Sequence, residues 1–222
     1  MQLYPSMMCA DYGNLAAEVR KLDAAGADSF HCDVMDGSFV PNIQMGAPDI
    51  QAVRANTEKP IDVHLMVENP GDKLDLFVGA GADVIYIHPE SERFVARALT
   101  AIREKGCRPG IAIDPDTPIA AIEEVLPLAD YVMAMTVNPG FAGQKFLEFT
   151  VGKIERLAAL KERYGFTLVI DGACSPERIE RLSALGADAF VLGTSALFGH
   201  GDYAQSMERL RALEGPRRFA AA

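Results

Sequence analysis

The stretch Gly26-Ala27-Asp28-Ser29-Phe30-His31-Cys32-Asp33-Val34-Met35 decides the fold, because its first three residues recur twice more in the chain. Gly81-Ala82-Asp83 and Gly186-Ala187-Asp188 also stand between an amphipathic, helix-like segment and an apolar, strand-like run. Glycine accepts the left-handed backbone conformation in which many helices end. Each triplet therefore marks a helix end followed by a strand start, and the chain consists of repeated strand–helix units.

Apolar runs rich in β-branched residues predict eight strands, over 3–6, 29–35, 61–66, 84–88, 109–113, 131–136, 167–171 and 189–193. Apolar residues three and four positions apart predict helices over 15–25, 48–55, 73–80, 92–104, 119–126, 149–164, 176–185 and 203–213. Segment 36–46 is rich in Pro, Asn and Gly, so we expect a long loop over the barrel mouth.

Eight such units suit an α/β fold of the (β/α)8 type, a TIM barrel, which typically has about 250 residues. A doubly wound sheet would carry a glycine-rich turn after its first strand, where this chain has Ser6-Met7-Met8-Cys9-Ala10. We therefore expect one single-domain barrel over residues 1–214 and a disordered tail over 215–222.

Composition limits the partners and the location of the protein. Its 31 acidic and 21 basic residues give a net charge of −10, and no basic run interleaves with aromatics, so nucleic acid is not an expected partner. No apolar stretch approaches the ~20 residues that span a bilayer, and no basic, apolar leader begins the chain. We expect a cytoplasmic protein with no membrane partner and with reduced, mostly buried cysteines, of which Cys174 is the most exposed.

Two strand ends carry the same polar pattern. Side chains alternate along a strand, so His31 and Asp33 share one face, as do Asp62 and His64. Asp171 ends a third strand. Taken singly, each residue is a satisfied core histidine or a turn carboxylate, but His31, Asp33, His64 and Asp171 together form a nitrogen and oxygen ligand set for one divalent ion. This set suits Zn²⁺, Fe²⁺, Mn²⁺ or Co²⁺ equally.

Three turns rich in small residues follow the last three predicted strands, at 138–144, 172–173 and 193–195. The phosphate sites of such barrels are usually built from the last loops, where backbone N–H groups contact the anion directly. The alternative for the first turn is an ordinary flexible loop. The three turns together predict a phosphate cradle.

The chain closely resembles the ribulose-phosphate 3-epimerase family from residue 5 to residue 198. The resemblance lies in His31-x-Asp33-x-Met35-Asp36-Gly37-x-Phe39-Val40-Pro41-Asn42, His64-Leu65-Met66-Val67, His88-Pro89-Glu90, Met135-x-Val137-x-Pro139-Gly140-Phe141-x-Gly143-Gln144 and Asp171-Gly172. It implies a ribulose-phosphate-binding barrel, an isomerase that inverts C3 of a ketose phosphate, and a homo-oligomer, either a dimer or a hexamer.

The resemblance also implies roles for single residues. Asp33 and Asp171 become the catalytic acid/base pair, which acts through an enediolate, and both also bind the one metal ion per chain with His31 and His64. The residues expected to bind substrate are Ser6, Met35, His64, Met66, His88, Met135 and Asn138. The residues expected to bind phosphate are Gly140, Phe141, Ala142, Gly143, Gly172, Ala173, Gly193 and Thr194.

Several positions differ from the common ribulose-phosphate pattern. Ala142, Ala173-Cys174 and Gly193-Thr194-Ser195 stand where Gly, a second Gly and Gly-Ser-Ala are usual, and Met8-Cys9 follows the first strand. These changes resemble the D-allulose-6-phosphate 3-epimerase branch, so we expect conversion of D-allulose 6-phosphate to D-fructose 6-phosphate. The alternative is interconversion of D-ribulose 5-phosphate and D-xylulose 5-phosphate.

Functions of other classes fit less well. A Schiff-base aldolase needs a lysine on a strand facing the barrel interior, and the predicted strand ends carry none. The Asp-x-Lys-x-x-Asp motif of related decarboxylases and synthases is also missing. A non-catalytic sugar-phosphate-binding barrel would have no need for two metal-bound carboxylates.

Overall fold

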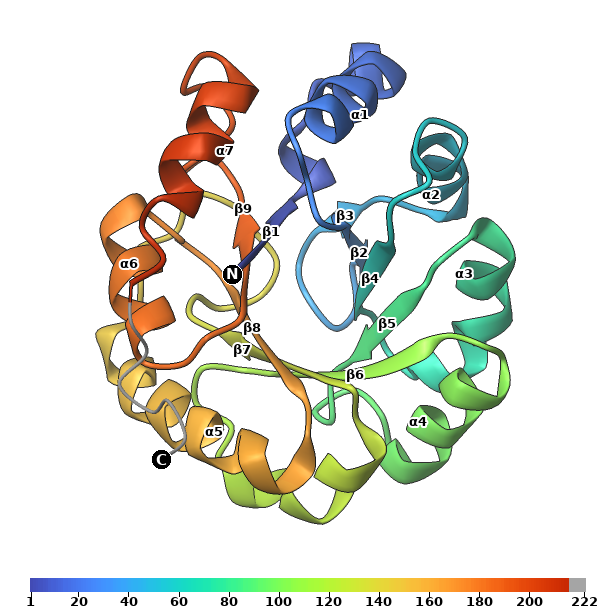
Figure 1. The fold of residues 1–222 in the computed structure, drawn as a ribbon. Helices are drawn as coiled ribbons and strands as arrows, with labels where there is room; N and C mark the ends of the chain where they lie inside the picture. The colour runs from blue at the N-terminus through green and yellow to red at the C-terminus, as the bar shows by residue number, and fades with distance from the viewer. Residues whose placement is uncertain (216–222) are drawn as a thin grey trace.

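A closed ring of eight parallel strands forms the centre of the computed structural model, which describes residues 1–215 (Figure 1). Each strand pairs in parallel with its neighbour, and an isolated bridge between Ser6 and His31 joins the first strand to the second. The predicted single-domain TIM barrel is confirmed. The strands of the ring are β1 (Gln2–Pro5), β2 (Phe30–Asp36), β4 (Ile61–Met66), β5 (Val84–Ile87), β6 (Arg108–Ile113), β7 (Tyr131–Met135), β8 (Thr167–Asp171) and β9 (Ala189–Leu192).

Helices surround the ring (Figure 1). Alternate strand residues such as Phe30, Cys32 and Val34 are buried in the main apolar core, which includes buried residues from the helices as well. Gly26, Gly81 and Gly186 have φ of 88°, 101° and 103°, as expected for residues that end helices. The helices are α1 (Leu15–Ala24), α2 (Ala47–Arg54), α3 (Leu74–Ala80), α4 (Val95–Glu104), α5 (Val151–Tyr164), α6 (Pro176–Ala184) and α7 (Tyr203–Arg211).

Two segments differ from the prediction. The helix expected over 119–126 is wrong, because the chain forms the 3₁₀ turns η4 (Ile119–Ala121) and η5 (Glu123–Leu128), and Pro127 within η5 has no N–H for an α-helical bond. The loop 36–46 contains a short strand, β3 (Ile43–Gln44), which pairs antiparallel with the end of β2. Asp36 helps to reverse the chain there, since its side chain accepts hydrogen bonds from the backbone of Ser38 and Phe39.

Large side chains fill the barrel interior below the polar strand ends. Tyr86 is fully buried in a cluster with Tyr4, Tyr131 and Met133. The ring of Tyr86 takes the space beside Gly110, where a Cβ atom would come within 2.4 Å of it. The interior is thus a packed core, and the polar strand ends lie above it at the mouth of the barrel.

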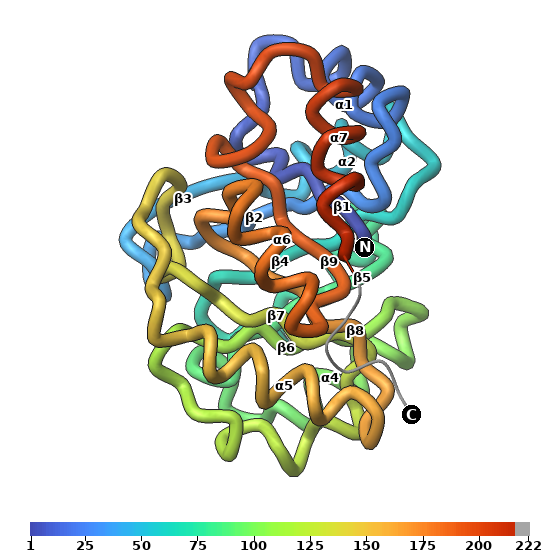
Figure 2. Tube along the Cα trace, turned by 60° about the vertical axis from the view of Figure 1, so that its left-hand side comes forward, coloured from blue at the N-terminus to red at the C-terminus, as the bar shows by residue number. Residues whose placement is uncertain are grey.

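The loops at that end contact one another. Figure 2 shows the β3 segment beside the loop that follows β7, and the Asn42 side chain donates a hydrogen bond of 2.8 Å to the Gly140 carbonyl. Additional 3₁₀ turns are η1 (Met7–Cys9), η2 (Tyr12–Asn14), η3 (Pro70–Lys73) and η6 (Glu148–Thr150).

Other expectations have mixed outcomes. All four cysteines are free, but Cys174 is buried between β8 and α6 and Cys9 is the partly exposed one, so the expected exposure of Cys174 is wrong. In residues 1–215 no helix is long and apolar enough to cross a membrane. The expected tail lies outside the described residues except for Gly215, and the domain boundary at residue 214 stays a prediction.

Candidate active site

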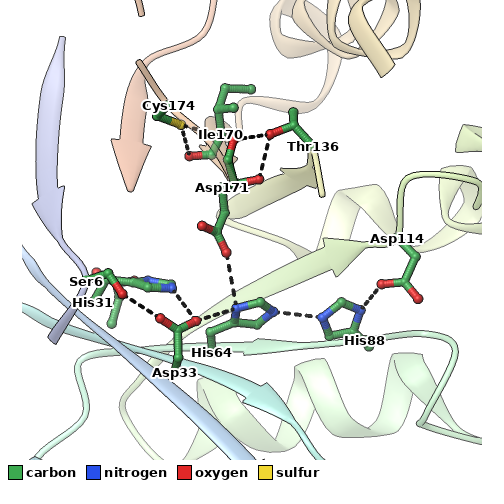
Figure 3. Close-up of polar contacts among 12 residues, drawn as sticks. Ser6, His31, Asp33, His64, His88, Asp114, Thr136, Ile170, Asp171 and Cys174 are labelled. Atoms are coloured by element: carbon green, nitrogen blue, oxygen red, sulfur yellow. Dashed lines mark hydrogen bonds and ion pairs between the residues drawn. The ribbon is translucent and has the colours of Figure 1, made fainter. Parts of the chain in front are cut away.

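Strands β2 and β4 place three polar side chains side by side at the barrel mouth (Figure 3). Their parallel register sets Asp33 next to His64 and His31 next to Asp62. The Oδ1 atom of Asp33 lies 3.1 Å from Nε2 of His31 and 3.3 Å from Nδ1 of His64. The alternation predicted from the sequence therefore brings both imidazoles onto one carboxylate.

Further hydrogen bonds orient this cluster. The Ser6 hydroxyl donates to Oδ2 of Asp33 at 2.7 Å. On the far side of His31, Nδ1 contacts Asp62, whose other oxygen accepts a hydrogen bond of 2.7 Å from the Ser29 hydroxyl. The Nε2 atom of His31 is thereby turned toward Asp33, as a metal ligand requires.

Asp171 reaches the same point from β8. Its Oδ2 lies 3.7 Å from Nδ1 of His64, although β1 and β9 separate β8 from β2 in the ring. Thr136, which follows β7, donates through its backbone N–H to the carbonyl of Asp171 at 2.8 Å and fixes the strand end. Gly172 has φ of 108°, and a Cβ atom there would lie 2.6 Å from Val137, so only glycine permits this turn.

The two carboxylates have opposite pKa shifts. Burial and the negative charge of Asp33 raise the pKa of Asp171 to about 7. Burial alone would raise the pKa of Asp33 too, but its contacts with His31 and His64 hold that pKa well below the ordinary value. Near neutral pH one carboxylate is therefore ionised while the other is close to half protonated, a pattern found at acid/base sites.

The histidines differ in the same way. Burial lowers the pKa of His64 to about 4, so this imidazole is neutral at pH 7. Burial would lower the pKa of His31 as well, but the charges of Asp33 and Asp62 outweigh it and raise that pKa well above its ordinary value. The carboxylates thus attract a positive charge into the site.

The cluster fits a divalent ion. One ligand atom from each of His31, Asp33, His64 and Asp171 lies within 4.8 Å of all the others. His64 is neutral, and a cation can displace the proton of His31, so the two imidazoles and two carboxylates form a mixed nitrogen and oxygen donor set. A cation between them would also relieve the repulsion that raises the pKa of Asp171. The residues of this cluster could therefore hold the predicted metal, whose identity the donor set leaves open.

A pocket opens above the cluster and brings most of the predicted site residues together. Among the described residues, no Lys or Arg lines this pocket, so a bound phosphate would depend on backbone N–H groups. The predicted residues that line it are Ser6, Asp33, Met35, Met66, Met135, Asn138, Gly140, Phe141, Ala142, Gly143, Asp171, Gly172, Ala173, Gly193 and Thr194.

Three predicted residues lie deeper. His31, His64 and His88 are fully buried, and His88 sits behind His64 and away from the pocket. The sequence interpretation gave no site role to four further residues. Met8, Cys9 and Val191 line the pocket, while Asp62 supports His31. Alternation along β4 puts Asp62 on the face of His64, which is the signal that identifies it.

Comparison with known proteins decides the family. Residues 2–198 match the ribulose-phosphate 3 epimerase family. The chain belongs to this family. The ribulose-phosphate 3-epimerase of Rhodobacter capsulatus is 41% identical over 199 residues, covering 90% of this chain and 87% of that protein. The ribulose-phosphate 3-epimerase of Bacillus subtilis is 38% identical over 214 residues, covering 95% and 98% of the two chains.

Structural similarity agrees on the fold. The crystal structure of 3-hexulose-6-phosphate synthase from Salmonella typhimurium matches with a TM-score of 0.72 at 15% identity and covers 96% of this chain and 98% of its own. Family membership confirms that the chain is an enzyme, an isomerase of the epimerase class. The family resemblance seen in the sequence is likewise confirmed.

Proposed function

We propose that the chain is a metal-dependent ketose-phosphate 3-epimerase that inverts C3 through an enediolate. The observation that supports this most directly is the pair of carboxylates, the buried Asp33 on β2 and the partly exposed Asp171 on β8, which meet at one four-ligand cluster. Epimerisation removes a weakly acidic proton beside the C2 carbonyl and returns one to the opposite face. Two carboxylates that approach from different strands suit the two faces, one as base and the other as acid.

The residues of the chain divide this work. The carboxylate of Asp33, ionised and held by Ser6, is placed to accept the C3 proton, while Asp171, on a different strand, is placed to deliver a proton to the opposite face. In the reverse direction the two exchange roles. A divalent ion bound by the four ligands would supply Lewis-acid stabilisation of the charge that develops on the C2 oxygen, worth several kcal/mol.

The pocket walls protect the reacting atoms. Met35, Met66 and Met135 are almost fully buried and line the pocket beside the carboxylates. Their thioethers are apolar and polarisable, so they exclude water without competing as hard metal ligands. The turns after β7, β8 and β9 form the other side of the pocket and would hold the phosphate.

For the substrate we propose D-allulose 6-phosphate. The positions that differ from the common pattern, Cys9, Ala142, Ala173 and Thr194, all line the same pocket, so they act together on the ligand. Ala173 adopts φ of 49°, a left-handed conformation that favours glycine, so alanine occupies this position at a backbone cost. The relatives named ribulose-phosphate 3-epimerases support D-ribulose 5-phosphate as the second candidate.

A direct kinetic comparison tests the substrate. We expect a higher kcat/KM for D-allulose 6-phosphate than for D-ribulose 5-phosphate, and little activity on unphosphorylated allulose or fructose. The triple variant Ala142→Gly, Ala173→Gly and Thr194→Ser should shift the ratio toward the pentose phosphate, because these positions contact the phosphate end. A wild-type preference for ribulose 5-phosphate would refute the allulose assignment and leave the epimerase mechanism intact.

Metal binding is expected to depend on pH. A cation must displace the proton of His31 and, below pH about 7, that of Asp171 as well. Because the protons compete with the cation, the apparent Zn²⁺ affinity should fall with decreasing pH. Below pH 7 the proton of Asp171 should add a further factor of about ten per pH unit to the decrease caused by the proton of His31. Chelator competition at several pH values measures this, and an affinity that is constant between pH about 5.5 and 7.5 would contradict it. Asp171→Asn should remove the additional dependence.

Other expectations about this protein remain proposals. One metal ion per chain, a homo-oligomer and a cytoplasmic location follow from the resemblance and the composition.

A further inference from the structure

His88 contacts a predicted metal ligand and no part of the pocket. Its side chain is fully buried, and its Nε2 lies 2.7 Å from Nε2 of His64 (Figure 3). The two rings meet edge to edge and are nearly coplanar (Figure 3), with centroids 5.0 Å apart and planes inclined by 23°. His88 is therefore placed to act on His64 and not on the substrate.

Two carboxylates face the other nitrogen of His88. Its Nδ1 lies 3.1 Å from Oδ1 of Asp114 and 3.3 Å from Oε2 of Glu90. Glu90 is fixed because its Oε1 accepts hydrogen bonds from the backbone N–H of Asp114 and from the Thr117 hydroxyl. The buried Lys153 ammonium donates to the carbonyls of Asp114 and Thr117 at 2.6 and 2.8 Å, which anchors the loop after β6.

The positions of the protons follow from these contacts. A cation in the cluster would take the lone pair on Nδ1 of His64, the nitrogen that faces Asp33 and Asp171. The proton of His64 is then on Nε2, and the short contact requires Nε2 of His88 to accept it. His88 in turn carries its proton on Nδ1, where the ionised carboxylates of Asp114 and Glu90 can accept it.

We propose that His88 is a positioning residue, held by Asp114 and Glu90, that keeps His64 in the tautomer whose Nδ1 lone pair faces the metal cluster. This inference rests on the proposed metal dependence. Asp62 does the same for His31 from the opposite side, since it contacts Nδ1 and leaves Nε2 directed to Asp33. Carboxylates thus orient both imidazoles from outside the cluster: Asp62 contacts His31 directly, while Asp114 and Glu90 act on His64 through His88.

The same three residues also form a ligand set of their own, with His88, Glu90 and Asp114 close enough to hold a cation. The positions of the protons on His88 and His64 argue against a cation at this second site. A cation on Nδ1 would put the proton of His88 on Nε2, which would then donate to His64 and move the proton of His64 to Nδ1. That nitrogen would lose its lone pair, so the second site and the first exclude each other.

Two substitutions of His88 test the proposal. In His88→Gln the amide oxygen can still accept from Nε2 of His64, whereas His88→Met has a similar unbranched shape and no comparable acceptor. We expect His88→Met to weaken Zn²⁺ binding by about 10–100-fold, and His88→Gln to stay within about threefold of the wild type. Zn²⁺ affinity is measured by chelator competition, with thermal unfolding to confirm that both variants fold.

A second readout uses the wild-type protein. In its Zn²⁺-loaded form, long-range ¹H–¹⁵N NMR of the histidine rings should show the His64 proton on Nε2 and the His88 proton on Nδ1. Removal of the carboxylates in the double variant Glu90→Gln, Asp114→Asn should weaken Zn²⁺ binding, because His88 then has no ionised acceptor for its Nδ1 proton. Glu92→Gln is the matched control, because Glu92 caps the backbone of Gly71 and Phe94 and does not face His88.

Several outcomes would overturn the role of His88. These are wild-type Zn²⁺ affinity in a folded His88→Met protein, a His64 proton on Nδ1 in the Zn²⁺-loaded wild type, or a second Zn²⁺ per chain that disappears in the Glu90/Asp114 double variant. Failure of the proposed function looks different. In that case the wild-type protein itself would bind no metal or would epimerise fully without it.

Discussion

Replacing Asp171 with asparagine is expected to lower kcat for C3 epimerisation by about 10²–10⁴-fold, the usual cost of losing a general acid or base. The amide cannot exchange a proton with C3, while its shape and its place at the end of β8 are preserved. Asp33→Asn should have an effect of the same size, because the second face of the substrate then lacks its partner. Steady-state kinetics in both directions provide the measurement.

Isotope exchange separates the two carboxylates. In D₂O each variant should still wash deuterium into C3 of one epimer only, and the two variants should favour opposite epimers. Metal content must be measured in each protein, because both residues belong to the ligand cluster. Asp75→Asn is a suitable control, since it removes an exposed carboxylate on α3 that pairs with Lys105 at the surface and should leave kcat within about twofold. Near-normal epimerisation with full metal occupancy would remove that aspartate from the mechanism.

Removal of the metal is expected to abolish turnover, by about 10³-fold or more, since Lewis-acid stabilisation of several kcal/mol is lost. Repulsion between the two carboxylates of the site adds to this loss. Without a cation, the pKa of Asp171 stays near 7 and the carboxylates of Asp33 and Asp171 repel each other. One equivalent of divalent metal per chain should restore the activity.

The experiment compares chelator-treated protein with the same protein after addition of Zn²⁺, Mn²⁺, Co²⁺ or Fe²⁺. Elemental analysis gives the residual metal, and circular dichroism verifies that the barrel survives treatment. Analysis of unsupplemented protein also identifies the native metal. If rigorously metal-free protein keeps full activity, the cluster of His31, Asp33, His64 and Asp171 has a different role.

Much of the barrel was predictable because its signals are local. The alternation of strands and helices is written in side-chain periodicities over a few residues, and glycine triplets mark the junctions. The prediction was wrong at 119–126, where the apolar spacing suits an α-helix but Pro127 removes a backbone donor. It also missed β3, because a two-residue strand has no periodicity of its own and exists through its pairing with β2.

The sequence by itself determined which side chains share a face, since alternation is a property of every strand: His31 with Asp33, and Asp62 with His64. It also indicated where a phosphate would be held, because three small-residue turns follow neighbouring predicted strands and their backbone N–H groups can approach an anion closely. Tertiary contacts alone bring Asp171 to His64 and turn His88 away from the pocket toward Asp114. They also separate the two pKa values, because His31 and His64 lower that of Asp33 while burial and the charge of Asp33 raise that of Asp171. These relations depend on strand register and ring closure between residues far apart in the chain, and on desolvation by the assembled core, which no local pattern encodes.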